Sequence, residues 1–341
     1  MGVRLEPADE YMHELGPEPN FNESMYINCF DPSTRMGGWF RMGNRANEGH
    51  AEMTICIYLP DGRVGFIFKR PEIDSNDALD AGGLTWTMVK PFEELRVDYS
   101  GKVCVLDDPH EMSDPRSAFK NNPFAECEVH VTFTGKGRTS MFGGEPDEPR
   151  EAPGEEFAKG HYEQLVEAHG SIRVGDQEWE MNGFGLRDHS WGPRYWQAPW
   201  YYRWLTANFG ADLGFMASRV AKKDGLGTRG GFVWDNGEIH LCDDVQVSTV
   251  VSGEDSYHQK VTGVIRSTRS HREWAFEGNV TSLIPLRNRR QDPDGNWLMT
   301  RISEGMTEWT ITSGEHAGKK GYGMSEYLDQ IIDGAPVGLA E

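Results

Sequence analysis

The chain has 341 residues, which is longer than one hydrophobic core usually serves, so its length favours two domains. Hydrophobic residues make up 37% of it and aromatic residues 11%, a composition that excludes a disordered chain. The formal net charge of -20 repels phosphate groups, so we expect neither nucleic acid nor an anionic membrane surface as a partner.

Alternation of apolar and polar residues runs through most of the chain and predicts β-strands. In segment 125–134, for example, Cys127, Val129, Val131 and Phe133 alternate with polar residues. The expected strands, in chain order, are 51–59, 63–70, 84–90, 95–106, 125–134, 171–181, 201–209, 212–221, 229–235, 238–250, 257–268, 272–284 and 297–312. Many short antiparallel strands predict an all-β fold of barrels or sandwiches.

Short turn motifs separate several of these strands: Asp61-Gly62, Gly175-Asp176, Asn236-Gly237 and Asp294-Gly295. Two segments interrupt the strand pattern. Segment 107–123 is rich in Asp, Pro and Asn, and segment 143–156 has the composition of a solvated loop. The two halves of the chain are both strand-rich, so we predict two similar β domains, residues 1–185 and 186–341.

The cysteines give no sign of a disulfide framework or a zinc ribbon, because their number is odd and none forms a C-x-x-C pair. They are Cys29, Cys56, Cys104, Cys127 and Cys242. The first residues lack the apolar segment of a secretion signal, and no run of eighteen apolar residues occurs. We therefore expect a cytoplasmic protein without a membrane anchor.

Most common catalytic motifs are missing from the sequence. Residues 225–230 satisfy G-x-G-x-x-G, but the residues that follow predict a strand rather than the helix that a dinucleotide site requires. The chain has no G-x-S-x-G, no G-x-x-x-x-G-K-[ST] and no H-E-x-x-H. We expect no cofactor and no bound metal.

His50 and Glu52 share one face of the strand expected at 51–59, together with Thr54, Cys56 and Tyr58. If that face lines a barrel, Glu52 is a candidate acid or base and His50 is its neighbour. The alternative is a solvated outer face.

The segment 183–196 concentrates an acid, an imidazole, two guanidinium groups and several aromatic rings, and four more aromatic residues follow it by position 204. If it is extended, Asp188 points away from Arg187, His189 and Trp191, so an Asp188–His189 dyad would need a bulge. Aromatic rings around Asp188 would desolvate its carboxyl group and raise its pKa, which suits a general acid. The alternative is that Asp188 pairs with Arg187 or Arg194 and the tryptophans fill the core.

The residues from Gly183 to Gly192 resemble the D-H-x-W-G signature of the carotenoid 1,2-hydratase and AttH-like family. Segments 160–164, 170–172 and 321–327 extend the resemblance, which is closest to an uncharacterised branch of that family. The resemblance implies two tandem lipocalin-like (calycin) β-barrels.

The resemblance also implies cofactor-independent chemistry on a C=C bond of an apolar molecule, by hydration, cyclisation or isomerisation. Asp188 matches the signature acid and would donate the proton, and His189 would orient the site or help activate water. The residues expected to contact the substrate and stabilise a cation are Trp191, Tyr195, Trp196, Trp204, His50, Arg187 and Tyr327.

A mean hydropathy of -0.62 favours a smaller terpenoid, steroid or polyketide over a carotenoid as the substrate. Glu304, Glu308 and Glu326 are further acids, for which we expect structural or surface roles. The alternative function is that of a non-catalytic calycin that carries an apolar ligand.

Overall fold

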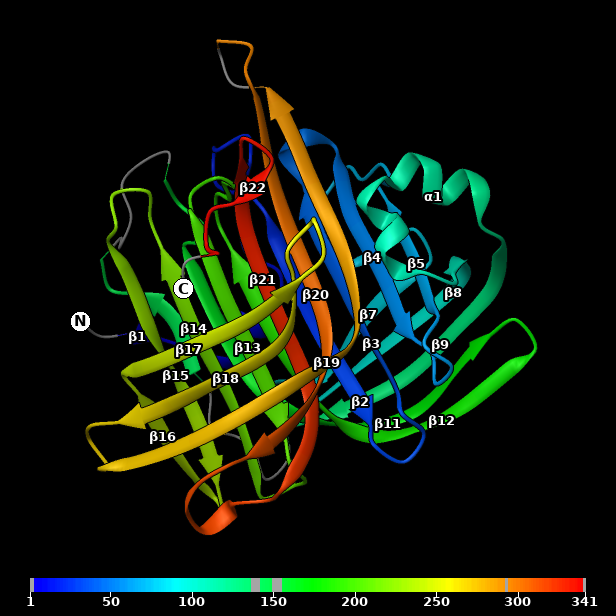
Figure 1. The fold of residues 1–341 in the computed structure, drawn as a ribbon. Coiled ribbons are helices and arrows are strands. Elements are labelled where there is room, and N and C mark those ends of the chain that lie inside the picture. The colour runs from blue at the N-terminus through cyan, green and yellow to red at the C-terminus, as the bar shows by residue number, and fades with distance from the viewer. Residues whose placement is uncertain (1–2, 136–141, 149–154, 292–293, 340–341) are drawn as a thin grey trace. The chain divides into compact units, whose positions relative to one another are not determined.

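The computed structural model describes residues 3–135, 142–148, 155–291 and 294–339. It is an all-β structure, with 64% strand and 7% helix, and it confirms the predicted fold class. The contacts divide the chain into two units, which are described separately below (Figure 1). Unit 1 comprises Met1–Asp107 and Phe119–Tyr195, and unit 2 comprises Asp108–Ala118 and Trp196–Glu341.

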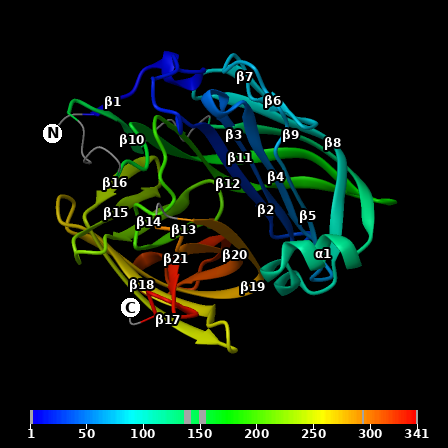
Figure 2. The same ribbon diagram turned by 90° about the horizontal axis from the view of Figure 1, so that it is seen from above.

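Unit 1 contains a closed barrel of eight antiparallel strands (Figures 1 and 2). It closes because β9 (Phe124–Thr134) pairs with both β8 (Glu94–Leu106) and β11 (Gly160–Val174). The other strands, in order from β11 to β8, are β12 (Gln177–Trp191), β2 (Glu23–Asp31), β3 (Met36–Arg45), β4 (His50–Tyr58) and β5 (Val64–Lys69).

Four short strands extend this barrel sheet. β10 (Phe142–Pro146) pairs with β11 and with β1 (Val3–Arg4), while β7 (Leu84–Lys90) pairs with β8 and with β6 (Asp80–Ala81). The 3-10 helices η1 (Pro7–Glu10) and η2 (Ala46–Glu48) lie in the connections of this unit.

The barrel interior is filled by every second residue of each strand. Ile27, Phe40, Ile55, Val97 and Val129 are fully buried there and belong to one apolar cluster. Because successive residues of a strand point to opposite faces, the residues between them lie on the outer face of the barrel. This alternation decides which side chains meet at the candidate site.

Unit 2 is an open, half-barrel sheet, and its core includes Leu205, Phe215, Phe276 and Trp309. Its strands, in sheet order, are β16 (Glu238–Cys242), β15 (Gly227–Asp235), β14 (Leu213–Ala221), β13 (Tyr201–Asn208), β21 (Lys320–Ile332), β20 (Trp297–Ile311), β19 (Arg272–Gln291), β18 (Tyr257–Ser267) and β17 (Asp244–Ser252). β22 (Ala335–Pro336) pairs with β21, and η4 (Gly314–His316) precedes β21.

Segment 107–123 interrupts the strands as expected. It contains η3 (Pro109–Ser113) and α1 (Pro115–Asn121) (Figure 1). Phe119 of α1 stacks on Phe66 of β5, with ring centroids 6.3 Å apart. Among the described helices, none is both long and apolar enough to span a bilayer.

Most expected strands are present, but two are divided and several were missed. A turn splits segment 171–181 between β11 and β12, and Asp243 separates β16 from β17 within 238–250. β2, β3 and β21 were not predicted. All nine residues of β2 are buried, so both of its faces are covered. Residues 24–29 alternate polar and apolar side chains, so the signal for this strand is present in the sequence.

The remaining predictions concern boundaries. Segment 143–156, expected as a solvated loop, overlaps the end of β10 at residues 143–146, and its residues 149–154 lie outside the described residues. The domain boundary between residues 185 and 186 stays a prediction. β12 runs through that position.

Candidate functional site

Asp188 stands on the outer face of β12, at the centre of a polar row across four strands. Glu163 of β11 and Tyr26 of β2 lie directly opposite it, and Arg41 of β3 lies opposite Tyr26. Directly opposite residues of antiparallel strands keep their Cβ atoms about 4.5–5.5 Å apart. The row therefore brings two carboxyl groups, a phenol and a guanidinium group together.

A second polar row adjoins the first. Ser190 lies opposite His161 and Ser24, and the Ser190 and Ser24 hydroxyl oxygens are 3.1 Å apart. Arg194 Nη2 donates a hydrogen bond to Ser190 Oγ at 2.5 Å. His161 Nε2 lies 3.0 Å from an oxygen of the Glu163 carboxylate. An imidazole and a second carboxyl group thus flank Asp188.

The environment of Asp188 favours its protonated form. Burial raises the pKa of its carboxyl group to about 6, and the Glu163 charge adds to this, although His161 and two arginines act in the opposite direction. Asp188 is partly buried, and its side chain makes no hydrogen bond or ion pair with the residues that the structure describes. A carboxyl group with this pKa is mostly protonated below pH 6, and a fraction of it still carries a proton at neutral pH that can be donated to a substrate.

His161 responds in the opposite sense. Burial, the largest effect, lowers the pKa of its imidazole, but the hydrogen bond to Glu163 and the charges of Asp188 and Glu163 outweigh burial and raise the pKa overall. The imidazole side chain is 40% exposed, whereas that of Glu163 is 4% exposed. A proton can therefore enter from the His161 side of the pair.

The same outer face becomes aromatic beside the Asp188 row. Tyr26 stacks with Trp39 at a centroid distance of 5.7 Å, and Trp39 Nε1 donates a hydrogen bond to the Tyr58 hydroxyl at 3.3 Å. Phe66 meets Trp39 edge to face at 6.4 Å. All four rings are buried. We call Tyr26, Trp39, Tyr58 and Phe66 the aromatic wall.

Sequence reasoning missed most of the aromatic wall because its residues lie far from segment 183–204. The signal that could have found it is the alternating face of β4, which carries Glu52, Thr54, Cys56 and Tyr58. Following that face across the sheet leads from Cys56 to Trp39 and to Phe66.

His189 and Trp191 lie on the face of β12 opposite Asp188, as strand alternation predicts. His189 Nε2 bonds to Glu23 Oε1 at 2.5 Å, and the His13 ring stacks on Trp191 with centroids 3.9 Å apart. Burial raises the pKa of the Glu23 carboxyl group, but hydrogen bonds from His13 and His189 outweigh it and lower the pKa to about 2. The structure therefore does not join Asp188 and His189 in one dyad.

Arg187 belongs to the same interior group. Its Nη1 donates to a Glu10 carboxylate oxygen at 3.0 Å and its Nε donates to Gln164 at 2.9 Å. The Tyr162 hydroxyl also donates to Glu10. Arg187 is thus held by ion pairing inside the barrel and does not border the aromatic wall.

Glu52 is buried on the outer face of β4 and is held by arginines. Arg70 Nη2 lies 3.1 Å and Arg41 Nη1 3.6 Å from its carboxylate oxygens. Burial raises the pKa of Glu52, but the charges of Arg41, Arg45 and Arg70 outweigh it and lower the pKa overall. Glu52 is therefore ionised, a state that suits a base or a charge partner rather than an acid.

His50, at the start of β4, precedes Glu52 by two residues and lies on the same face of the strand. Its Nε2 is 3.8 Å from a carboxylate oxygen of Glu48, and the side chain is 23% exposed. Tyr195 closes unit 1, where its backbone N–H donates to the Glu156 carbonyl. Within the described residues, neither His50 nor Tyr195 forms a hydrogen bond or ion pair with the Asp188 side chain.

The remaining predicted residues belong to unit 2. Trp204 of β13 lies opposite Glu326 of β21, and Glu304 of β20 lies opposite Glu326 on its other side. The Tyr202 hydroxyl donates to the Glu326 carboxylate. Tyr327 points to the other face of β21, into the unit 2 core, and Trp196 begins this unit.

Two groups of described residues bring three potential metal-donor atoms within 4.8 Å of one another: His13, Glu23 and His189, and Asp235, Glu315 and His316. Hydrogen bonds already join the atoms of the first group. In the second, Asp235 Oδ1 is paired with His316 and Asp235 Oδ2 with Arg272. We assign neither group to a metal.

Comparison with known proteins identifies a family and a fold. A family model described as a domain of unknown function (DUF7064) matches residues 6–331. No curated protein matches the sequence. The solved structure of kievitone hydratase from Nectria haematococca has 10% identity and a TM-score of 0.57, over 90% of this chain and 88% of that chain.

Two further solved structures share the fold. A protein assigned as AttH from Nitrosomonas europaea has 13% identity and a TM-score of 0.51, over 96% of each chain. CghA in complex with Sch210972 has 14% identity and a TM-score of 0.51, over 91% of this chain and 88% of that chain. At these identities, the likeness shows the fold alone.

Proposed function

We propose that this chain, which belongs to the family described as a domain of unknown function (DUF7064), is an enzyme that protonates a C=C bond of an apolar small molecule. The observation that carries the proposal is Asp188, a carboxyl group with a pKa raised to about 6 beside a buried aromatic wall. The reaction class is hydration, cyclisation or isomerisation without a cofactor, and the substrate class is terpenoid-like or steroid-like.

Asp188 would act as the proton donor. The π electrons of the alkene take the Asp188 proton, so a C–H bond forms and the neighbouring carbon becomes a cation. Aromatic faces stabilise such a cation through their negative quadrupole. In a hydratase, water then adds to the cation and returns a proton to the Asp188 carboxylate, and the net product is the alcohol.

The pair of His161 and Glu163 would exchange protons between solvent and Asp188 when Asp188 is ionised before the reaction. Glu163 lies directly opposite Asp188 and bonds to His161, whose side chain is more exposed than that of Glu163. At the other end of the row, Arg41 and its ion-pair partner Glu52 would fix the local electrostatic potential. His189 would position β12 through its bond to Glu23 rather than contact the substrate.

The fold supports a small-molecule enzyme. One solved structure with this fold is named as a hydratase, which is the reaction class that a single protonated carboxyl group can support. The polar row and the aromatic wall lie side by side on β12, β2, β3 and β4. This is the pairing of acid and aromatic surface that cation chemistry requires.

The test is Asp188→Asn, assayed with a panel of terpenes and steroids for addition of water or for an isomeric product. Asparagine keeps the size of the side chain but has no carboxyl proton to donate. We expect turnover to fall by about 10²–10⁴-fold, the usual contribution of general acid catalysis. The matched control is Asp98→Asn, at an exposed carboxylate of β8 that pairs with His130 and should leave turnover unchanged.

The alternative function, a carrier of an apolar ligand, predicts a different result. It expects no turnover by the unmodified protein and equal ligand affinity before and after Asp188→Asn. Quenching of tryptophan fluorescence by the same compounds measures that affinity. Turnover that survives in Asp188→Asn would contradict the assignment of Asp188 as the acid.

A further inference from the structure

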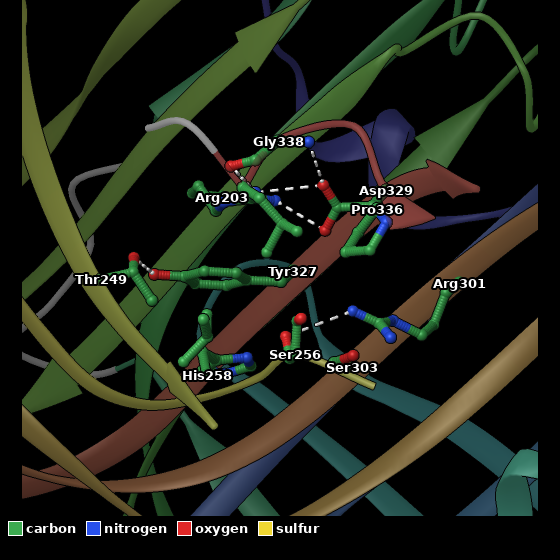
Figure 3. A pocket seen from close by; sticks show the side chains of 12 residues that line it. Arg203, Thr249, Ser256, His258, Arg301, Ser303, Tyr327, Asp329, Pro336 and Gly338 are labelled. Atoms are coloured by element: carbon green, nitrogen blue, oxygen red, sulfur yellow. Dashed lines mark hydrogen bonds and ion pairs between the residues drawn. The ribbon is translucent and has the colours of Figure 1, made fainter. Parts of the chain in front are cut away.

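A small pocket lies in unit 2, between β13, β17, β18, β20, β21 and the segment that follows β22 (Figure 3). Its volume is about 10 Å³. That is room for one species of the size of a water molecule or a halide ion. The proposed alkene chemistry does not use this pocket.

One guanidinium group at the pocket is fully matched by acceptors. Arg203 Nη1 and Nη2 bind the two Asp329 carboxylate oxygens at 3.0 and 3.1 Å. Arg203 Nη2 also donates to the Gly338 carbonyl at 2.8 Å, and the Gly338 N–H donates to Asp329 at 2.9 Å. The charge of Arg203 is therefore balanced by Asp329.

The second guanidinium group has no carboxylate of its own. Arg301 donates to the backbone carbonyls of Asp255 at 2.5 Å and of Ser256 at 3.5 Å. Its Nε is buried without an acceptor, and no acidic side chain among the described residues forms an ion pair with it. Figure 3 shows its guanidinium group directed toward Ser256 and the pocket.

The other pocket residues add hydroxyl groups and no second carboxylate. Ser303 lies opposite Tyr327, and the Tyr327 hydroxyl bonds to Thr249 at 2.6 Å. The His258 ring stacks on Tyr327 at 3.9 Å. Burial lowers the pKa of His258 to about 3, and the charges of Arg203 and Arg301 act in the same direction. The imidazole is therefore neutral, and the electrostatic potential at His258 is positive.

From two guanidinium groups and one carboxylate in a space of this size, we propose that the pocket binds a monovalent anion of halide size, with Arg301 as its charge partner. A partly buried guanidinium group without a counter-ion is costly, and a bound anion offsets that cost. The size of the pocket favours chloride or bromide over sulfate or a larger organic anion. The bound anion would also bridge β20 and β21 to the segment after β22.

Thermal unfolding of the full chain, measured against chloride at constant ionic strength with gluconate as the replacing anion, tests the proposal. An anion that binds only the folded state raises Tm in a saturable way. We expect chloride and bromide to do so and sulfate, matched for ionic strength, not to. Crystals grown in bromide should show one anomalous peak beside Arg301. A water molecule there instead, with no chloride dependence of Tm, would overturn the proposal.

The matched variants are Arg301→Gln and Arg289→Gln, each of which removes one positive charge. Arg301→Gln should abolish the saturable rise in Tm. Arg289 lies on β19, with its guanidinium group 4.8 Å from the Trp297 ring, and Arg289→Gln should keep the rise. If both variants respond to chloride as the unmodified chain does, the site is not at Arg301.

A second variant covers the case in which Arg301→Gln does not fold. Ser303→Ala removes one hydroxyl donor of the pocket and leaves every charge in place. We expect it to weaken chloride binding by about fivefold, the value of one ordinary hydrogen bond. Chloride affinity unchanged in Ser303→Ala would count against the pocket as the binding site.

Discussion

At the scale of single residues, Asp188 combines a proposed use with a cost in stability. Its pKa is about 6 in the folded protein, against 3.8 for an ordinary Asp. Between these pH values the folded state holds the proton more tightly than the unfolded state. The free energy of unfolding therefore falls as the pH rises through this window, and above it the ionised Asp188 keeps the folded state less stable.

Asp188→Asn should remove this cost. Well above pH 6, we expect the free energy of unfolding of the variant to exceed that of the unmodified chain by about 1–3 kcal/mol, since one pKa unit corresponds to about 1.4 kcal/mol. Urea denaturation at several pH values measures the difference. The gain should shrink as the pH approaches 3.8, and a difference that does not vary with pH would mean that Asp188 does not titrate as described.

Two neighbouring residues of the motif have separate partners. Asp188 lies among the polar groups of the outer face, whereas His189 bonds to Glu23 inside the barrel. The resemblance to the D-H-x-W-G signature gave both a proposed catalytic role. The one-residue alternation of a strand separates them by the thickness of the sheet.

At the scale of the elements, β12 pairs closely with β2 because two of its residues are glycines. A Cβ atom on Gly185 would lie 1.7 Å from the Asn28 carbonyl oxygen, and one on Gly183 would lie 2.2 Å from the Phe30 carbonyl oxygen. Both of these oxygens belong to the backbone of β2, so they cannot move aside without breaking the pairing. The glycines of the motif therefore serve the pairing of two barrel strands.

Gly185→Ala tests this role. We expect it to lower the free energy of unfolding by about 3 kcal/mol or more, because a methyl group would force β2 and β12 apart. Chemical denaturation measures the loss. Gly230→Ala on β15 is the control, since its Cβ would meet the Cys242 carbonyl oxygen at 3.1 Å and should cost less. Equal losses in the two variants would contradict the close-pairing explanation.

At the scale of the whole molecule, all five cysteines are free and buried. Four of them lie in unit 1 and Cys242 lies in unit 2. Burial raises the pKa of the Cys127 and Cys242 thiols to about 12, so neither is a thiolate at neutral pH. The thiolate is the reactive form of cysteine, and a buried thiol is in addition out of reach of reagents.

We therefore expect the native protein to react very slowly with a colorimetric thiol reagent at neutral pH. After denaturation in guanidinium chloride, all five thiols should react at once. The time course of reagent absorbance measures both states. Rapid labelling of one thiol in the native protein would show that its unit opens readily or that the residue is exposed.

Much of the fold follows from the sequence, because period-two alternation depends only on local chemistry. The all-β class and most strands were predicted in this way, and the likeness to lipocalin-like structures agrees with the resemblance seen in the motif. β2 was not predicted, although Ser24, Tyr26 and Asn28 alternate there with Met25, Ile27 and Cys29, and both of its faces are buried. Segment 107–123, which was expected to interrupt the strand pattern, does so with the short helices η3 and α1.

The sequence by itself determined that Asp188 and His189 would face opposite ways, since strand geometry requires it. Only the tertiary structure decided which residues accompany Asp188. Strand pairing placed Glu163, Tyr26 and Arg41 beside it, and the register of β2 to β5 placed Trp39 and Phe66 in the aromatic wall. Register is a property of pairs of strands far apart in the chain, so no local pattern could specify it.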